Sequence, residues 1–369
     1  MVLKKDTIQL IIHTILIIFF IYKFTRIPIH DKNEFLERKQ KQKTKRNQHI
    51  NTYINKQNTI KNYFYAEAYD IVSPFTQKSL YWGWIAGSNA RAFNPGIYNT
   101  PNVESSTTTP GARTYVSSWT VESKAQIYMF GGLGYDGNGA TSTTGFLSDL
   151  WRFDINTLNW TFISSETTVN TNLMDQYAVY GFGNTPDAEN HPGGRQQTAY
   201  FMDSNEVMWM FGGDGYASSG ARGYLRDMWK YDPNGVAQWE PSNYHAPGPS
   251  SQFVDQPGTY ASGTQSDLIP GARAAMTFGI DSTNKLWMYG GIGMTSTANA
   301  ASCRDLWYYD TTTNLWHLEA GDDQQDIASS FGTQGVTYPA TTHFPGSRDR
   351  AAMFIHPNAN IIYIFGGFS

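Results

Sequence analysis

Arginine and aspartate side chains recur in a regular pattern, and they are the residues best suited to chemistry in this chain. The motif Pro-Gly-x-Arg occurs four times, and its arginines are Arg113, Arg195, Arg273 and Arg348. Aspartates follow the first three of them at Asp149, Asp227 and Asp305. A guanidinium and a carboxylate can pair with each other or hold a ligand. Because the combination recurs once in each repeat, we expect buried structural ion pairs rather than a ring of ligand-binding arginines.

Metal-binding and catalytic patterns are weak. The histidines of the C-terminal part stand at unlike places in the repeats, without i,i+4 spacing: His191, His245, His317, His343 and His356. The segment Asp136-Gly137-Asn138-Gly139 resembles the start of a calcium loop but lacks its later acidic ligands. The single cysteine, Cys303, excludes an intrachain disulfide and multi-cysteine zinc sites. We therefore expect no cofactor, no metal and no catalytic residues.

Three further markers accompany Pro-Gly-x-Arg and define a repeat. Apolar strands end in paired glycines at Gly131 and Gly132, Gly212 and Gly213, Gly290 and Gly291, and Gly366 and Gly367. One tryptophan comes two residues after each aspartate, and a second follows it: Trp151 and Trp160, Trp229 and Trp239, Trp307 and Trp316. Successive arginines lie 82, 78 and 75 residues apart, so the markers recur in one order.

Each repeat has the sequence pattern of a four-stranded antiparallel meander. Strand one follows the arginine, strand two ends in Gly-Gly, strand three carries the aspartate and first tryptophan, and strand four carries the second tryptophan. Alternating apolar residues rich in aromatic and β-branched types predict these strands. One such sheet cannot bury both of its faces, so the repeats must pack against one another.

The Gly-Gly pairs, the aromatic pattern after them and the spaced tryptophans resemble the Kelch motif across about residues 80–369. This resemblance implies an all-β fold, a β-propeller of four-stranded Kelch-type blades related to the central domain of galactose-oxidase-like proteins. Kelch repeats commonly run to about 50 residues, and the repeats here are longer. The additional residues lie mainly between the second tryptophan and the next Pro-Gly-x-Arg motif.

The fourth repeat shows only its first two strands. The segment Trp82–Gly87 resembles an isolated strand four, like Trp316–Gly321, and Ala66–Asp70 resembles a degraded strand three. Propellers of this kind often complete the last blade with an N-terminal strand. We therefore expect three whole blades and one split blade, with an arc of a larger ring as the alternative.

Strand direction alternates within a blade, so long and short loops fall on opposite faces. One face carries the Gly-Gly loops and the long links before each Pro-Gly-x-Arg motif. Long loops on a rigid scaffold are common places for binding residues. The candidate binding residues on this face are Tyr135, Asp136, Asn138, His191, Asp214, Tyr216 and His343.

The N-terminal region differs from the rest. Residues 1–24 contain an apolar run that predicts a membrane-anchoring helix or a signal-like segment, and residues 25–61 form a basic polar linker before the propeller at 62–369. More Lys and Arg follow the run than precede it, which places the propeller in the cytoplasm if the run is an anchor. A secreted protein is the alternative.

Charge and composition narrow the function. Residues 1–70 have a net charge of +7, while residues 71–369 have −11, which argues against a nucleic-acid surface on the globular part. We expect a non-catalytic propeller, tethered to a membrane, that binds a partner protein through its loop-rich face. The alternatives are a galactose-oxidase-like or other sugar-modifying enzyme, and an extracellular carbohydrate-binding module.

Overall fold

A computed structural model of the chain describes residues 83–85, 87, 94–137, 144–164, 173–180, 189–242, 253–261, 267–297, 299–334, 336, 343–356 and 361–368. Its contacts divide the chain into Met1–Trp84 and Ile85–Ser369, and the fold described below belongs to the second unit. The expected anchor, the linker and the strand at Ala66–Asp70 lie outside the described residues. Gly83, Trp84, Ile85 and Gly87 are described and lie in no strand.

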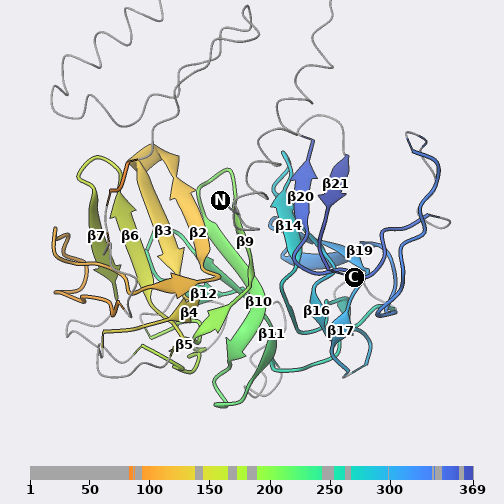
Figure 1. The fold of residues 1–369 in the computed structure, drawn as a ribbon, viewed down its shortest axis with the longest axis horizontal. Coiled ribbons are helices and arrows are strands. Elements are labelled where there is room, and N and C mark those ends of the chain that lie inside the picture. Colours follow the sequence, from red (N-terminus) through yellow and green to blue (C-terminus); the bar gives the residue numbers. More distant parts are fainter. Residues whose placement is uncertain are drawn as a thin grey trace, which may run out of the picture. The chain divides into compact units, whose positions relative to one another are not determined.

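The described part is an all-β structure of six antiparallel sheets (Figure 1). It includes the short 3-10 turn η1 (Glu122–Lys124). No helix in these described ranges has the length and apolar character needed to cross a membrane.

The first repeat forms a four-stranded meander, as its sequence predicts. Its strands pair in the order β2 (Ser117–Val121), β3 (Gln126–Phe130), β6 (Leu150–Asp154) and β7 (Asn159–Ile163). A separate small sheet contains β1 (Arg113–Thr114), β4 (Leu133–Gly134) and β5 (Gly145–Phe146). The sequence pattern did not predict this small sheet.

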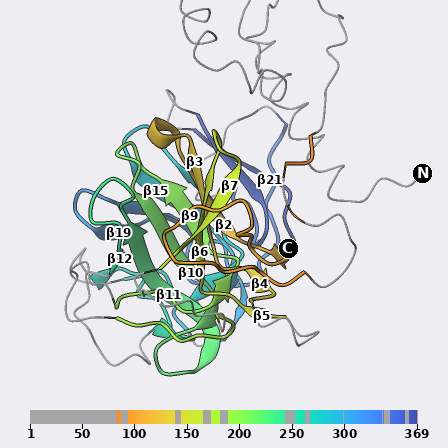
Figure 2. The same cartoon turned by 90° about the vertical axis from the view of Figure 1, so that its left-hand side faces the viewer.

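In the second repeat, the small sheet is merged with the large one. The strands are β8 (Arg195–Gln196), β9 (Ala199–Met202), β10 (Met208–Tyr216), β11 (Arg222–Tyr231) and β12 (Trp239–Pro241). The long strand β10 pairs with both β9 and β8 along one edge, and with β11 along the other. The β10–β11 hairpin projects at the bottom of the molecule in both views (Figures 1 and 2).

The third repeat returns to the arrangement of the first. Its meander contains β14 (Thr277–Ile280), β15 (Lys285–Tyr289), β18 (Leu306–Asp310) and β19 (Leu315–Ala320). Its small sheet contains β13 (Arg273–Ala274), β16 (Ile292–Gly293) and β17 (Ala301–Ser302).

The fourth repeat contributes a two-stranded sheet. Its strands are β20 (Ala352–Ile355) and β21 (Ile362–Phe365), which correspond to strands one and two of the other repeats.

A residue with left-handed backbone conformation stands two positions after each repeated arginine. These residues are Tyr115, Gln197, Ala275 and Arg350, with φ between 53° and 57°. The kink separates the short strand at the arginine from strand one of the meander. The kink also lets neighbouring repeats form a backbone hydrogen bond. The N–H of each left-handed residue donates to the carbonyl of the equivalent residue in the preceding repeat, at 3.4 Å for Gln197 and 2.9 Å for Ala275 and Arg350. The inner strands of all four repeats are thereby linked in chain order.

The paired glycines allow the repeats to approach closely. Gly131 and Gly212 have φ values of +66° and +64°, which residues with a side chain rarely adopt. A Cβ atom on either would also lie 2.8 or 2.7 Å from the carbonyl oxygen of the next repeat's arginine, Arg195 or Arg273. The glycine pairs are therefore required by the contact between repeats as well as by the turn.

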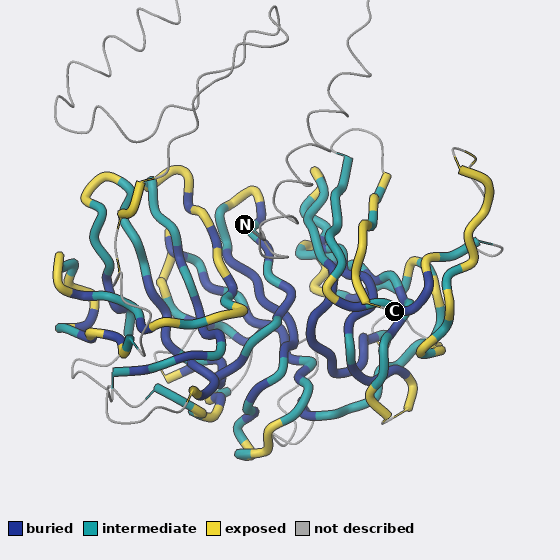
Figure 3. The backbone as a smooth tube through the Cα atoms, viewed as in Figure 1, coloured by how far each residue is buried: buried dark blue, intermediate teal, exposed yellow. Residues whose placement is uncertain are grey.

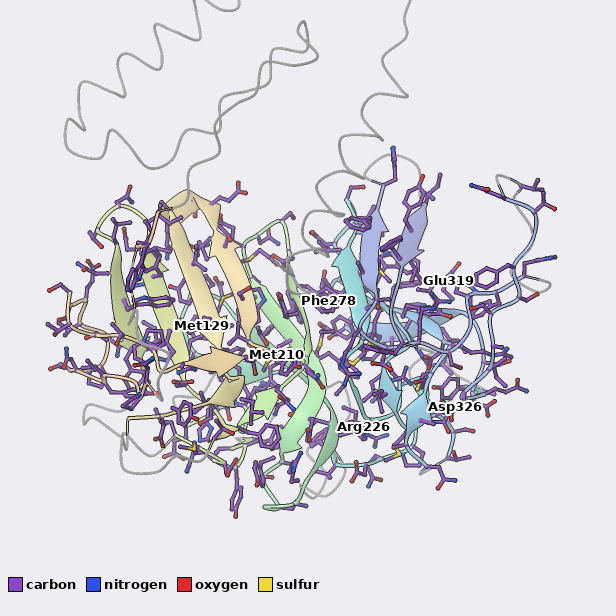
Figure 4. The ribbon with its side chains drawn as sticks, viewed as in Figure 1. Met129, Met210, Arg226, Phe278, Glu319 and Asp326 are labelled. Carbon is purple, nitrogen blue, oxygen red and sulfur yellow. The ribbon has the colours of Figure 1, made fainter. Side chains whose placement is uncertain are left out.

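Aromatic and aliphatic side chains fill the space between successive sheets. One core contains Tyr128 and Phe130 of the first sheet packed with Met208 and Met210 of the second. Another joins Phe211 and its neighbours to the third sheet. Met210 is labelled in Figure 4, and Figure 3 shows how strongly these middle strands are buried. Burial of these side chains supplies most of the stabilisation between the repeats.

Candidate functional site

Each of the first three arginines forms a buried ion pair with the aspartate of its own repeat. The Nη1–Oδ1 distance is 2.6 Å for both Arg195–Asp227 and Arg273–Asp305, and all four side chains are fully buried. Arg113 and Asp149 pair in the same way. The second nitrogen of each guanidinium bonds the second carboxylate oxygen, which makes the pairs bidentate. The repeated arginines therefore hold their own strands together.

A tyrosine and a tryptophan complete each ion pair. The tyrosine hydroxyls donate to the aspartate Oδ2 atoms at 2.5 to 2.6 Å, and they belong to Tyr98, Tyr180 and Tyr260. The tryptophan two residues after the aspartate donates its Nε1–H to the same oxygen. We call this set the Arg–Asp–Tyr–Trp network. It fastens the long link before each repeat to strand three.

The network controls the ionisation of its members. Burial alone would raise the pKa of Asp227, but Arg195 and the hydrogen bonds from Tyr180 and Trp229 hold this pKa below its usual value. Burial and the neighbouring Asp227 charge raise the pKa of Tyr180 well above its usual value. The aspartate is thus ionised and the tyrosine protonated at neutral pH. The hydrogen bonds of the network therefore persist around neutral pH, and its role is structural.

The expected binding residues of the first repeat are Tyr135, Asp136 and Asn138, and the two that the structure describes differ in burial. Tyr135 is half-buried, and its N–H donates to the carbonyl of Ala112. Asp136 is buried, since its carboxylate accepts the N–H of Leu173 and its carbonyl accepts the N–H of Gly96. It stabilises the loops and is not presented to solvent as the sequence suggested. Asn138 lies outside the described residues.

The two expected histidines are half-buried. His191 follows the long link of the second repeat, with its Nδ1 3.3 Å from the carbonyl of Pro192. It lines a cavity of about 580 Å³ together with Arg152 and Tyr231 of the first and second sheets. His343 belongs to the fourth repeat, where it lies two residues before the Pro-Gly-x-Arg motif.

Asp214 and Tyr216 lie together at the end of the β10–β11 hairpin. The carboxylate of Asp214 pairs with Arg222 across the hairpin, at 3.0 Å between Oδ2 and Nη2. The Tyr216 ring contacts Tyr177 and Phe146, with centroid distances of 5.8 and 6.0 Å. We call Phe146, Tyr177, Asp214, Tyr216 and Arg222 the tyrosine–arginine cluster.

Three separate chain segments assemble this cluster. Phe146 comes from β5 of the first repeat, Tyr177 from the link that follows it, and the other three from the β10–β11 hairpin. The guanidinium of Arg222 covers the Phe146 ring at 4.5 Å, an attractive cation–π geometry. Tyr177 and the side chain of Arg222 remain more than half exposed. The cluster therefore offers aromatic area and charged hydrogen-bonding groups to solvent together.

Nearby carboxylates make the cluster unsuited to tyrosinate chemistry. Partial burial and the charge of Asp175 raise the pKa of Tyr216, while Arg222 opposes them. The phenol is protonated at neutral pH and can donate a hydrogen bond. This arrangement favours recognition of polar and apolar groups on another molecule over proton abstraction.

The repeat pattern in the sequence does not identify Tyr177, Arg222 and Phe146 as residues of a site. None of the three belongs to a repeated motif, so periodicity gave no reason to select them. The unusual length of the β10–β11 hairpin depends on the link Ala217–Ala221. Its glycine and polar residues were a signal for a turn, but not for a strand extension.

The single thiol is enclosed. Cys303 is buried, and its Sγ lies 3.6 Å from the carbonyl oxygen of Ala301. Burial raises its pKa to about 12, so the sulfur carries a proton at neutral pH. No group of three metal-ligating side chains converges within the described part of the chain. Comparisons with models of known families and with curated proteins gave no match for this sequence.

Proposed function

We propose that residues 62–369 form a β-propeller of Kelch-type blades that binds a partner protein and catalyses no reaction. Two observations support the propeller. Successive sheets share apolar cores, and the first strands β2, β9, β14 and β20 contact one another in chain order. Four-stranded sheets repeated around an axis would have these neighbours.

The tyrosine–arginine cluster is the observation that carries the binding proposal. Tyrosine and arginine contribute strongly to protein interfaces, because each combines a large contact area with directional hydrogen bonds. Here Tyr216 and Arg222 stand on the paired strands β10 and β11, and Tyr177 packs on the Tyr216 ring from the preceding link. A rigid platform of this kind loses little conformational entropy when a partner binds.

Site-specific photo-crosslinking tests the proposal. A photoreactive phenylalanine analogue replaces Tyr177 in one variant and Val236 in another, since Val236 is exposed in the turn between β11 and β12. We expect the Tyr177 position to capture a discrete protein, and Arg222→Ala to reduce that capture at least about tenfold. Equal capture from both positions, or capture unaffected by Arg222→Ala, would contradict the proposal.

We also propose that the apolar run within residues 1–24 tethers the propeller to a membrane on its cytoplasmic side. The distribution of Lys and Arg around the run supports this orientation. The chain should then resist alkaline extraction from membranes, and protease added outside sealed cells should leave the propeller intact.

A further inference from the structure

A cavity lies between the first and second sheets. Its volume is about 580 Å³, which is within the range of small-molecule sites. The first sheet contributes Arg152 of β6 and Phe162 of β7 to its lining, and the second contributes Tyr231 of β11 and Trp239 of β12. We call it the inter-sheet cavity. Aromatic rings around a cationic group suit a small organic molecule that carries a negative charge.

The Arg152 guanidinium in this cavity pairs with no carboxylate of the described residues. The side chain is half-buried, its Nη2 donates to the hydroxyl of Thr161 at 3.2 Å, and its Nε is buried without an acceptor. Donors in the interior of a protein nearly always have a partner, so an unpaired one calls for an explanation. The charge of Arg152 is therefore available to an anion that enters the cavity.

The second repeat shows which group pairs with a cation at this place. Lys230 and Arg152 occupy equivalent positions, and their neighbours on the fourth strand are Glu240 and Thr161. The Lys230 Nζ lies 2.9 Å from Oε1 of Glu240. In the first repeat the hydroxyl of Thr161 replaces this carboxylate. A carboxylate supplied by a ligand would restore the pairing that the second repeat makes within the chain.

A tyrosine on the opposite sheet shows the same contrast between the two interfaces. Tyr231 and Tyr309 occupy equivalent positions in β11 and β18. The Tyr309 hydroxyl lies 3.1 Å from the Ser242 hydroxyl and 3.1 Å from Oδ1 of Asn314, so groups of the chain satisfy it. The Tyr231 hydroxyl has no hydrogen-bond partner among the described residues, and its side chain lines the inter-sheet cavity.

The charges around the cavity favour an anion. Lys124 lines it in addition to Arg152. Asp149 is also a lining residue, but Arg113 neutralises its charge through their ion pair. Burial raises the pKa of Tyr231, so its phenol is protonated at neutral pH and can donate a hydrogen bond. The cavity thus combines two cationic side chains with a neutral donor.

We propose that the inter-sheet cavity binds a small organic acid, whose carboxylate pairs with Arg152 and accepts a hydrogen bond from Tyr231. The apolar or aromatic body of the acid packs against Phe162 and Trp239. Two observations choose a carboxylate: Glu240 fills the equivalent place in the second repeat, and a guanidinium matches the planar geometry of a carboxylate. The site is separate from the tyrosine–arginine cluster and does not depend on a partner protein.

Binding of naphthoate to the full-length chain tests the proposal. The matched control is naphthamide, which has the same rings without the negative charge. We expect calorimetric titration to show binding of naphthoate, and roughly ten- to hundredfold weaker binding of the amide because the charge-assisted bonds are lost. Arg152→Met should weaken naphthoate to a similar degree. Lys230→Met should leave its affinity within about twofold, because Lys230 lies over the Trp209 ring at the next interface.

A further variant tests the comparison with the second repeat. Thr161→Glu places a carboxylate beside Arg152, as Glu240 is beside Lys230, and should weaken naphthoate by about tenfold or more. Equal binding of the two probes to the unmodified chain, or an affinity for naphthoate unaffected by Arg152→Met, would overturn the proposal. Displacement of naphthoate by inorganic phosphate at equal concentration would also overturn it, because the site would then select charge alone. The comparison of the two probes uses only the unmodified chain, so it decides the matter even if a variant does not fold.

Discussion

Buried charge is compensated residue by residue in the Arg–Asp–Tyr–Trp networks. An arginine with no exposure to solvent cannot escape its charge by losing a proton, because its pKa is far above neutrality. The aspartate therefore does more than add an attraction. It removes the penalty that the unpaired guanidinium would incur in a low-dielectric interior.

Replacement of Asp227 by alanine should strongly destabilise the protein. The change leaves Arg195 buried without a counter-charge, and we expect a loss of about 3 to 5 kcal/mol in the free energy of unfolding. Equilibrium urea denaturation measures it. Asp214→Ala is the control, because the Asp214–Arg222 pair is partly exposed and should contribute about 0 to 1 kcal/mol. Equal losses for the two variants would show that burial of the Arg195–Asp227 pair does not matter.

The network tyrosines should make the protein sensitive to alkaline pH. The pKa values of Tyr98 and Tyr180 are raised in the folded state by burial, and by Asp149 and Asp227. Above pH of about 10 the unfolded chain loses these phenolic protons while the folded chain keeps them, so stability present below pH 10 declines as the pH rises. Exposed tyrosines should ionise while the protein is folded, and a further increase in tyrosinate absorbance should accompany unfolding. An increase that is complete before the fold is lost would contradict this assignment.

At the scale of elements, the glycine pairs join the end of strand two to the following repeat. The same left-handed backbone occurs at Gly212 and Gly366, with φ of +64° and +71°. Their surroundings differ, because a Cβ on Gly212 meets the carbonyl of Arg273 and a Cβ on Gly366 meets no described atom within 4 Å. The two sites therefore separate backbone strain from the contact between repeats.

Gly212→Ala should cost more stability than Gly366→Ala. Backbone strain alone should cost each variant about 1 to 2 kcal/mol. The clash with Arg273 should add about 1 to 3 kcal/mol for Gly212→Ala only, since the facing atom belongs to rigid backbone. Thermal and urea denaturation of both variants measure the difference. Equal costs would mean that the glycines serve the turn and not the junction between repeats.

The elements could be predicted from the sequence where a motif recurs. The Gly-Gly pairs and Asp-x-Trp motifs gave the order of strands in the three complete meanders, and the recurrence of arginine with aspartate gave the ion pairs. The network tyrosines could not be predicted in the same way. Tyr98 and Tyr260 follow Pro-Gly, but Tyr180 follows Gln176-Tyr177-Ala178, so only the shared backbone position relates it to them.

The candidate site was predicted less well than the fold. Asp214 and Tyr216 were identified from their place after a Gly-Gly pair, but their partners Tyr177 and Arg222 belong to no repeated motif. Asp136 occupies a similar place in its own repeat and is buried, because the link at Leu173 folds over it. Loop residues depend on contacts between distant segments, which a periodic pattern does not specify.

At the scale of the molecule, the repeats are joined at three levels. The left-handed residues after the arginines link the inner strands, the glycine pairs meet the next repeat's arginine, and aromatic cores fill the space between sheets. The turns add side-chain bonds on the opposite face, as when the Ser204 N–H donates to Asn284 at 3.0 Å. Such junctions couple each sheet to its neighbours, so the sheets should not unfold independently.

Urea denaturation of the full-length chain, followed by tryptophan fluorescence and by far-ultraviolet circular dichroism, tests most directly whether the repeats form one packed array. Seven tryptophans are buried in the cores and networks, and fluorescence reports their surroundings. Circular dichroism reports the strands of all repeats. We predict a single transition with the same midpoint for both signals. Separate midpoints, with fluorescence changing while much of the strand signal remains, would contradict the account, because the sheets would then be independent bodies.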